Sequence, residues 1–184
     1  MTARPRLGRD MMRMIAAAAL LTAAAGIAGA QAPATPKVAT LKNAAGSTIG
    51  QVTLTDASRG VLVRVEASGL APGWHGIHFH EKGDCSDPAF KMAGGHVHQM
   101  TPVMHGLLNP QANDLGDLPN VYAGPDGKVN AEFYSTYVAM RDGTARANLL
   151  DADGSAVVIH AKPDDLMTQP IGGAGDRVAC AVVK

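Results

Sequence analysis

Short segments in which apolar and polar residues alternate occur along this chain from about residue 37 onward. In the first part of the pattern the alternating apolar positions are Val52, Leu54, Val61, Val63 and Val65. A period of two is typical of β-strands with one buried face. Turn-forming residues at 43–46 and 58–60 separate the segments. The pattern therefore predicts strands at residues 38–41, 48–55 and 61–65.

The same alternation returns in the second half of the chain. It predicts strands at residues 129–134, 144–149, 155–160 and 177–183. Residues 82–118 and 162–176 show no periodicity, and structureless segments of this length in a compact domain are usually functional. Many short strands at close spacing favour an all-β fold, an antiparallel β-sandwich or barrel of about eight strands with two long loops.

The strand predicted at Gly76–Glu81 carries the most distinctive chemistry of the chain. Side chains two positions apart share a face of a strand, so His78 and His80 would project together while Ile77 and Phe79 pack on the other face. Further candidate ligands are His96, His98, His105, Asp114, Asp117 and His160. Among divalent first-row ions, Cu²⁺ binds imidazole-rich sites most tightly. The sequence therefore predicts a metalloprotein.

The first 30 residues have the pattern of a secretory signal peptide. Four arginines lie within residues 4–13, an apolar alanine-rich stretch covers 14–27, and Ala28-Gly29-Ala30 offers a small-residue cleavage site. A membrane anchor is the less favoured alternative, because prolines follow at once and no stop-transfer flank is present. We therefore expect a signal peptide at 1–30, a flexible segment at 31–36, one domain at 37–184, and export to the periplasm.

Charge and cysteine content narrow the possibilities further. Residues 31–184 contain 12 Lys or Arg and 15 Asp or Glu, which does not suggest nucleic-acid binding. A small anionic substrate would need local positive charge. Export permits a disulfide between Cys85 and Cys180. Two free thiols or thiolate metal ligands are the competing interpretation, although neither cysteine belongs to a CxxC pair.

Five motifs, in order and at close to family spacing, resemble the Cu/Zn superoxide dismutase family of the exported bacterial type. The matching segments are Gly73-Trp74-His75-Gly76-Ile77-His78-Phe79-His80-Glu81-Lys82-Gly83-Asp84-Cys85, Ala93-Gly94-Gly95-His96, Leu115-Gly116-Asp117-Leu118-Pro119, Val157-Val158-Ile159-His160 with Pro163-Asp164-Asp165, and Gly172-Gly173-Ala174-Gly175-Asp176-Arg177-Val178-Ala179-Cys180. The resemblance covers residues 37–184. It implies a Greek-key β-sandwich with two long functional loops.

The resemblance also implies the copper ligands, which would be His78, His80, His96 and His160. In the family, the position of His96 is an imidazolate that bridges copper and zinc and takes up a proton when copper is reduced. His75, in the same motif, matches a family histidine that is not a ligand, and we expect it to be structural.

The zinc ligands are where the sequence departs from the family pattern. His96, His105 and Asp117 match, but Asp114 stands where the family has a histidine. A carboxylate can bind zinc at a similar bond length, so Asp114 is the favoured fourth ligand. Two alternatives stay open: His98 could rotate into the site, or zinc could bind weakly or be absent.

The resemblance assigns roles to further residues. Asp164 would link a copper-binding histidine to the zinc-binding His105, and such outer partners fix ring orientation. Arg177 would attract and hold the anionic substrate beside copper. Cys85 and Cys180 would form a disulfide that ties a metal-binding loop to the last strand.

The function implied is superoxide dismutation, in which alternating copper redox converts superoxide to dioxygen and hydrogen peroxide. The catalytic residues would be Arg177 and His96, and the cofactors copper and zinc. A non-enzymatic envelope protein that stores or delivers copper on the same scaffold is the alternative. We expect superoxide as the small-molecule partner, no nucleic acid, no membrane in the mature form, and a monomer or homodimer.

Overall fold

The computed structural model describes residues 1–2 and 35–184 of the 184-residue chain. Most of the predicted signal peptide (1–30) and residues 31–34 of the predicted flexible segment lie outside the described residues. Within the described range, no helix has the length and apolar character needed to cross a membrane.

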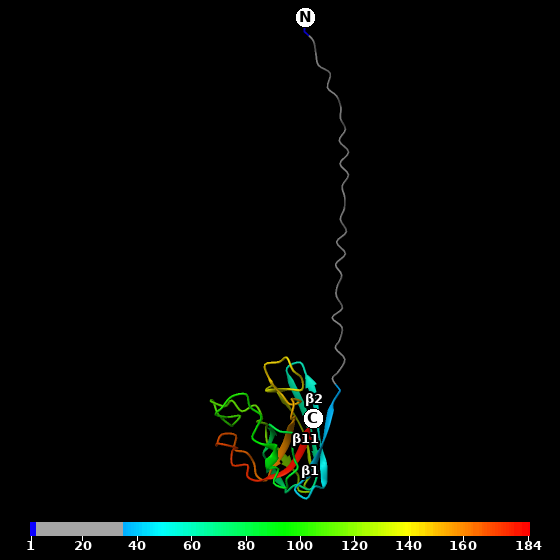
Figure 1. Cartoon of the computed structure of the whole chain (residues 1–184), viewed down its shortest axis with the longest axis vertical. Coiled ribbons are helices and arrows are strands. Elements are labelled where there is room, and N and C mark those ends of the chain that lie inside the picture. The colour runs from blue at the N-terminus through cyan, green and yellow to red at the C-terminus, as the bar shows by residue number, and fades with distance from the viewer. Residues whose placement is uncertain (3–34) are drawn as a thin grey trace. The chain divides into compact units, whose positions relative to one another are not determined.

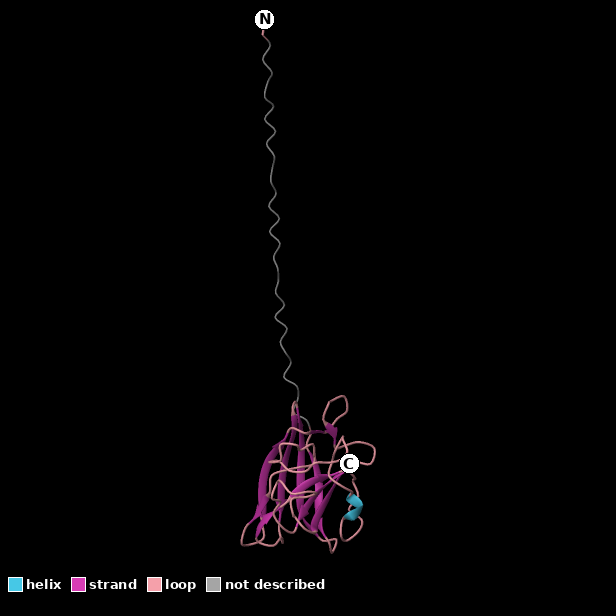
Figure 2. Ribbon diagram, turned by 90° about the vertical axis from the view of Figure 1, so that its left-hand side faces the viewer, coloured by secondary structure: helices cyan, strands magenta, loops and turns pink. Residues whose placement is uncertain are grey.

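Seven antiparallel strands form the main sheet, in the order β5-β10-β11-β1-β2-β3-β7 (Figures 1 and 2). Their bounds are β1 Lys37–Asn43, β2 Thr48–Ala57, β3 Gly60–Ala67, β5 Ile77–His80, β7 Val129–Ser135, β10 Ser155–His160 and β11 Arg177–Val183. The first and last strands are neighbours, with Leu41 opposite Ala181. The chain crosses from β3 to β5 at the far end of this order, the kind of crossover found in Greek-key folds.

Four short strands and one 3₁₀ helix complete the described structure. β4 (Gly73–His75) pairs with β6 (Val121–Ala123), β8 (Val138–Ala139) runs parallel to β9 (Ala147–Asn148), and the 3₁₀ helix η1 is Lys91–Ala93. The described residues thus contain eleven strands, more than the eight or so predicted. The prediction missed β4, β6 and β8. Of the strand expected at 144–149, only the two residues of β9 are paired. Strands of two or three residues are too short to show a periodic pattern.

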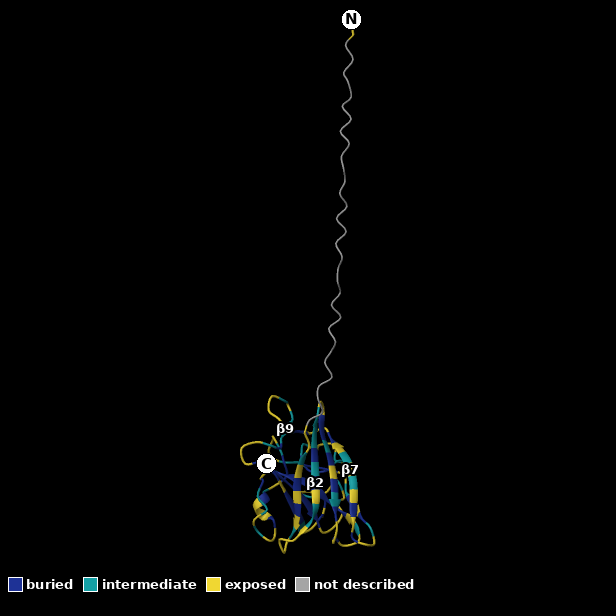
Figure 3. Ribbon diagram, turned by 90° about the vertical axis from the view of Figure 1, so that its right-hand side faces the viewer, coloured by how far each residue is buried: buried dark blue, intermediate teal, exposed yellow. Residues whose placement is uncertain are grey.

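The alternating pattern in β2 and β3 marks the core, as predicted. Val52, Leu54, Val61, Val63 and Val65 are all fully buried. In Figure 3 buried and intermediate residues alternate in the middle of β2, and exposed and intermediate residues alternate along β7. The sheet curls so that the apolar side chains of its inner face pack against each other. Removing these side chains from water is the main contribution to the stability of the fold.

β5 is the exception, because both of its faces are buried. Ile77 and Phe79 join the main apolar core, whereas His78 and His80 lie on the other face. Residues 82–118 and 162–176, the two aperiodic segments, lie on the same side of the sheet in Figure 1 and contact each other, as where Leu108 N–H donates to the Leu166 carbonyl. The loops therefore enclose the histidine face of β5.

A disulfide anchors the first of these loops. Cys85 in the loop is bonded to Cys180 in β11. Around it lies a second, small apolar cluster that contains Phe90 and Ala93 from the loop and Val158 from β10. The loop segment is therefore held to the sheet by a covalent bond and by its own buried contacts.

Replacing both Cys85 and Cys180 by alanine is expected to lower the free energy of unfolding of the metal-free protein by about 2–5 kcal/mol, because the unfolded chain regains the freedom that the cross-link removes. Urea unfolding of this variant, of wild type and of reduced wild type would measure the effect. The reduced wild type should behave like the variant. Equal urea midpoints for all three proteins would contradict the prediction.

Candidate metal centre

Four histidines that are distant in sequence converge on one point. His78 and His80 come from β5, His96 from the first loop, and His160 from the end of β10. β5 and β10 are paired so that Val158 lies opposite His78, and His80 lies opposite His96. One ring nitrogen from each of the four histidines lies within 4.8 Å of the others, and all four side chains are buried.

One nitrogen of each ring has a hydrogen-bond partner that fixes the orientation of the ring. The contacts are His78 Nε2 to Asp164 Oδ2 (2.9 Å), His80 Nδ1 to the Gly94 carbonyl (3.0 Å), His96 Nδ1 to Asp114 Oδ2 (2.6 Å) and His160 Nδ1 to the Gly175 carbonyl (3.1 Å). A hydrogen bond at one ring nitrogen fixes the orientation of the ring and leaves the lone pair of the other nitrogen free to bind a metal ion.

The other nitrogen of each ring has no partner. Among the described residues, five buried side-chain nitrogen or oxygen atoms lack a hydrogen bond, and four of them are His78 Nδ1, His80 Nε2, His96 Nε2 and His160 Nε2. A buried polar atom left unpaired costs about 1–3 kcal/mol, so four in one place require an explanation. Four converging imidazole nitrogens are a donor set that suits Cu²⁺. The residues present therefore fit a copper ion.

Burial keeps three of these rings uncharged at neutral pH. Desolvation lowers the pKa of His78 and of His80, and it lowers the pKa of His160 to about 3. A metal ligand must present a free lone pair, so rings that resist protonation are ready to bind.

A second group lies next to the first and shares His96. His96 Nδ1 is 2.6 Å from Asp114 Oδ2 and 3.5 Å from Asp117 Oδ1. His105 Nδ1 is 3.6 Å from Asp114 Oδ2 and 2.6 Å from Asp117 Oδ1. Ligand atoms around a tetrahedral zinc ion with bonds of about 2.1 Å are about 3.4 Å apart. Two of the four separations are close to this value, and the two of 2.6 Å are hydrogen bonds that a bound ion would replace. Two nitrogens and two carboxylate oxygens are a donor set that suits zinc.

His78 also lies within 4.8 Å of the ligand atoms of His96, His105 and Asp117. Its Nε2 is occupied by Asp164, however, and its remaining lone pair on Nδ1 can bind only one ion. Since Nδ1 is one of the four converging nitrogens, we assign His78 to the first group, which leaves Asp114 Oδ2 as the candidate for the fourth ligand atom of the second.

The second group has the opposite protonation behaviour. Burial disfavours the cation, but hydrogen bonds with Asp114 and Asp117 outweigh it, raising the pKa of His96 and raising that of His105 to about 11. Burial would raise the pKa of Asp114, yet hydrogen bonds from His105 and His96 lower it. Without a metal, two imidazolium–carboxylate pairs hold this group together, and a metal ion entering it must displace protons.

Asp164 joins the two groups. Its Oδ2 is 2.9 Å from His78 Nε2 and its Oδ1 is 3.0 Å from His105 Nε2. Asn120 holds its backbone: Asp164 N–H donates to Asn120 Oδ1 and Asn120 Nδ2 donates to the Asp164 carbonyl. A Cβ at Gly172, where φ is +58°, would lie 1.6 Å from Asp164 Oδ1, so this position requires glycine. The sequence analysis did not single out Asn120. It follows the aperiodic segment 82–118, where no pattern of residues indicates which side chains make long-range contacts.

His75 and His98 do not join either group. His75 places its two ring nitrogens 2.7 Å from the carbonyls of His160 and Ala71, which ties β4 to β10. His98 directs Nδ1 at the His96 carbonyl, at 2.8 Å, and its side chain is 25% exposed. The structure brings Asp114, and not His98, to the second group.

Arg177 lies beside the first group. Its Nη1 donates to the Phe90 carbonyl (2.6 Å) and its Nη2 to the Gly94 carbonyl (2.7 Å). The pKa values of His80 and His160 are lowered mainly by burial and also by neighbouring histidines. The positive charge of Arg177 makes a further, smaller contribution in the same direction. A hollow of about 440 Å³ here is lined by Ala89, Lys91, Gly175, Asp176 and Arg177. Lys91 is a second cation at this opening that the sequence analysis did not single out.

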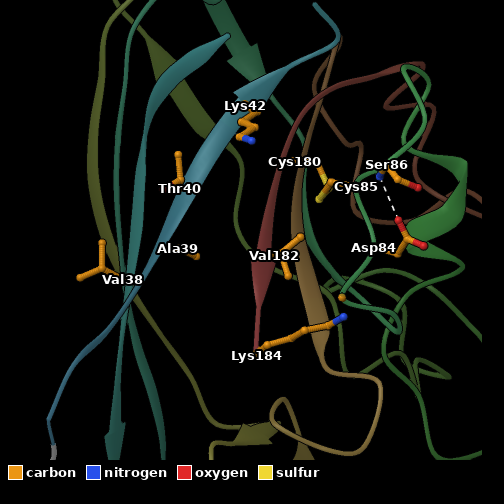
Figure 4. Close-up of a pocket in the computed structure, with 11 residues that line it drawn as sticks. Val38, Ala39, Thr40, Lys42, Asp84, Cys85, Ser86, Cys180, Val182 and Lys184 are labelled. Atoms are coloured by element: carbon orange, nitrogen blue, oxygen red, sulfur yellow. Dashed lines mark hydrogen bonds between the residues drawn. A yellow bond between two sulfur atoms is a disulfide. The ribbon is translucent and has the colours of Figure 1, made fainter. Parts of the chain in front are cut away.

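A larger hollow, of about 670 Å³, lies elsewhere, along β1 and β11 (Figure 4). The Cys85–Cys180 disulfide and Lys184 line it, and none of the converging histidines does. None of the residues of the two metal-binding groups lines this hollow, and we assign it no role in their chemistry.

Replacing Asp114 by alanine is expected to weaken zinc binding at least tenfold, because it removes one of four ligand atoms, while copper binding is largely retained. Zinc content after dialysis against a chelator of graded strength would measure the loss. His98→Ala is the matched control and should keep zinc. If His98→Ala lost zinc and Asp114→Ala kept it, the assignment would be reversed.

The lowered pKa of His160 predicts how metal-free stability depends on pH. His160 is protonated below about pH 6.5 in the unfolded chain but only near pH 3 in the folded one. Above pH 6.5 the ring is neutral in both states. Below pH 6.5 the unfolded chain takes up a proton that the folded chain does not, so the free energy of unfolding falls by about 1.4 kcal/mol per pH unit. Urea unfolding between pH 6.5 and 4.5 should show a shallower slope for His160→Gln than for wild type, and equal slopes would refute this.

Comparisons with known proteins agree with this geometry. The family model described as copper/zinc superoxide dismutase matches residues 48–183. A Cu-Zn superoxide dismutase of Caulobacter vibrioides is 55% identical over 174 residues, which is 95% of this chain and all of the relative. Superoxide dismutase [Cu-Zn] 2 of Aquifex aeolicus is 39% identical over 147 residues, covering 79% of this chain and 85% of the relative.

Solved structures show the same fold. A superoxide-dismutase-like protein from Bacillus subtilis has a TM-score of 0.74 at 34% identity, over 80% of this chain and 97% of that one. The Cu/Zn superoxide dismutase from Brucella abortus has a TM-score of 0.65 at 26% identity, over 82% of this chain and 100% of that one.

Proposed function

The chain belongs to the copper/zinc superoxide dismutase family and is a superoxide dismutase, and we propose that its chemistry takes place at the two metal groups described above. The proposed copper ligands are His78, His80, His96 and His160. The proposed zinc ligands are His96, His105, Asp114 and Asp117. The observation that carries the proposal is the set of four buried ring nitrogens that converge without partners.

Copper bound there would supply a one-electron couple, which takes an electron from one superoxide, releasing dioxygen, and gives an electron to a second, which leaves as hydrogen peroxide. The remaining chemistry belongs to the protein. His78, His80 and His160 present neutral nitrogens, each aimed by a hydrogen bond on the opposite side of its ring. This arrangement holds the ion in place without adding charge to the site.

His96 is the proposed proton donor because its ring faces both groups. Its Nδ1 lies among the carboxylates of Asp114 and Asp117, and its Nε2 is among the four converging nitrogens. Nε2 can therefore carry a proton whenever it is not bound to the ion. Peroxide needs two protons, of which His96 Nε2 would supply one and water the other.

Arg177 is the proposed binding residue for superoxide. The backbone carbonyls of Phe90 and Gly94 hold its guanidinium beside the four converging ring nitrogens. The half-buried guanidinium remains a cation. Lys91 adds positive charge to the same hollow, while Asp176 partly offsets it. Since the mature chain carries a slight excess of acidic residues, this local charge is what draws the anion inward.

We further propose that residues 1–30 direct export and that residues 37–184 act in the periplasm. The Cys85–Cys180 disulfide supports this, because such bonds persist in oxidising compartments. All proposed ligands come from one chain, so a monomer carries a complete site. We expect the mature domain to bind neither nucleic acid nor membrane.

The test is a superoxide assay on purified protein loaded with one copper and one zinc. High activity, and its loss together with copper in His160→Gln, would support the proposal. Protein that binds copper through these histidines yet leaves superoxide untouched would instead favour a copper carrier.

Replacing Arg177 by alanine is expected to lower kcat/KM for superoxide about tenfold or more, because the anion loses its nearest fixed cation. Copper content should stay unchanged. Lys91→Gln should cause a smaller loss that fades at high salt, since its charge is exposed. Arg64→Ala, which removes a cation from the solvent-facing side of β3, is the control. Equal kcat/KM for Arg177→Ala and Arg64→Ala would rule out the assigned role.

A further inference from the structure

One backbone carbonyl connects the proposed copper site to the proposed substrate-binding residue. The Gly94 carbonyl oxygen accepts from His80 Nδ1 at 3.0 Å and from Arg177 Nη2 at 2.7 Å. The direction of this carbonyl therefore helps to set both the ring orientation of a copper ligand and the position of the guanidinium. It belongs to the Gly94–Gly95 peptide unit, which has glycine on both sides.

A peptide between two glycines is conformationally permissive, because neither residue has a Cβ that restricts rotation. Gly94 has φ 77° and ψ −155°, a conformation that favours glycine. Some other group must therefore keep this peptide plane from turning. The contacts around it identify that group as Glu81, the residue that follows His80.

Glu81 contacts this peptide unit and its neighbour from two directions. Its Oε1 accepts the Gly95 N–H at 3.0 Å, and its own N–H donates to the Gly95 carbonyl at 2.9 Å. A Cβ built on Gly94 would lie 2.5 Å from Glu81 Oε1 and 2.7 Å from Glu81 Cγ. The side chain thus fills the space beside the Gly94 α-carbon, which also explains why this position needs glycine.

The Gly95 N–H and the Gly94 carbonyl are the two ends of the same trans peptide. In a planar trans peptide they point in opposite directions, so a carboxylate that holds the N–H also aims the carbonyl.

We propose that Glu81 is a positioning residue which, through the Gly94–Gly95 peptide, orients both the copper ligand His80 and the guanidinium of Arg177. This inference rests on the proposed copper site. It goes beyond the ligand set because Glu81 touches neither the proposed ion nor the substrate. A carboxylate one peptide away from the guanidinium of Arg177 would by its charge alone repel superoxide, so the geometric role and the electrostatic role predict opposite effects on rate.

The test compares Glu81→Ala, Glu81→Asp and Glu81→Gln with wild type, and uses Glu132→Ala, on the exposed side of β7, as control. Alanine removes the acceptor, aspartate keeps the charge on a side chain one methylene shorter, and glutamine keeps an acceptor oxygen at the same length without the charge. The readouts are the electron paramagnetic resonance spectrum of the Cu²⁺ protein, the copper dissociation constant by chelator competition, and kcat/KM for superoxide.

We expect Glu81→Ala and Glu81→Asp to change the Cu²⁺ spectrum, to weaken copper binding about tenfold and to lower kcat/KM, as loss of outer hydrogen-bond partners does at metal sites. Glu81→Gln should restore the wild-type spectrum and affinity. Zinc content should be the same in all variants. Glu81→Ala and Glu81→Asp test the same loss independently, so if either fails to fold, the other still decides by comparison with Glu81→Gln.

Two results would overturn the proposal. One is a Glu81→Ala protein whose spectrum and copper affinity match those of Glu132→Ala. The other is a Glu81→Gln protein that behaves like Glu81→Ala, which would assign the effect to charge. Inactive wild-type protein with bound copper would defeat the proposed function, but the spectra and affinities would still test the role of Glu81.

Discussion

The arrangement of this protein depends on one constraint: each of four buried imidazole rings is held by a hydrogen bond on one nitrogen so that the other faces a common point. The partners differ in kind. Two are backbone carbonyls, of Gly94 and Gly175, and two are carboxylates, of Asp164 and Asp114. If any partner were lost, a ring could turn and satisfy its free nitrogen elsewhere, and the set of converging lone pairs would be incomplete.

These partners lie on the loops and not on the sheet, which explains why the loops are tied down so heavily. The Cys85–Cys180 disulfide and the apolar cluster around Phe90 hold the first loop to β10 and β11. Asn120 holds the backbone of Asp164, and Arg177 binds the carbonyls of Phe90 and Gly94. The strands of the sheet supply three of the proposed ligands directly, and cross-linked irregular loops supply the rest.

The two adjoining groups differ in charge although they share a ring. In the first group, burial outweighs the carboxylate of Asp164 and keeps the rings neutral, whereas in the second group Asp114 and Asp117 stabilise imidazolium. His96 lies between the two environments. The aspartate at position 114 gives the second group two carboxylates, which balance two imidazolium charges. A histidine at this position would leave only the carboxylate of Asp117.

Alternation of apolar residues was enough to predict the strands that form the core, because burial of one strand face is a local property with a period of two. It also placed His78 and His80 on one face, and Ser155–His160 and Arg177–Val183 appear with the predicted bounds. The types of candidate ligands, the family and the order of its motifs could likewise be read from the residues alone. The strands β4, β6 and β8 were missed and β9 was predicted too long, because pairing of two or three residues depends on their neighbours in space.

The folded structure was needed to see that the side chain of Asp114 contacts the rings of His96 and His105 while His98 turns to a backbone carbonyl, since both residues lie within reach along the chain. It was also needed to find Asn120, Lys91 and the contact of Glu81 with the Gly94–Gly95 peptide. Asp164 and His78 are separated by 86 residues, and Arg177 and Gly94 by 83. Contacts across such separations arise from how strands and loops pack together, and no local pattern of residues encodes which ring nitrogen or which carbonyl they will meet.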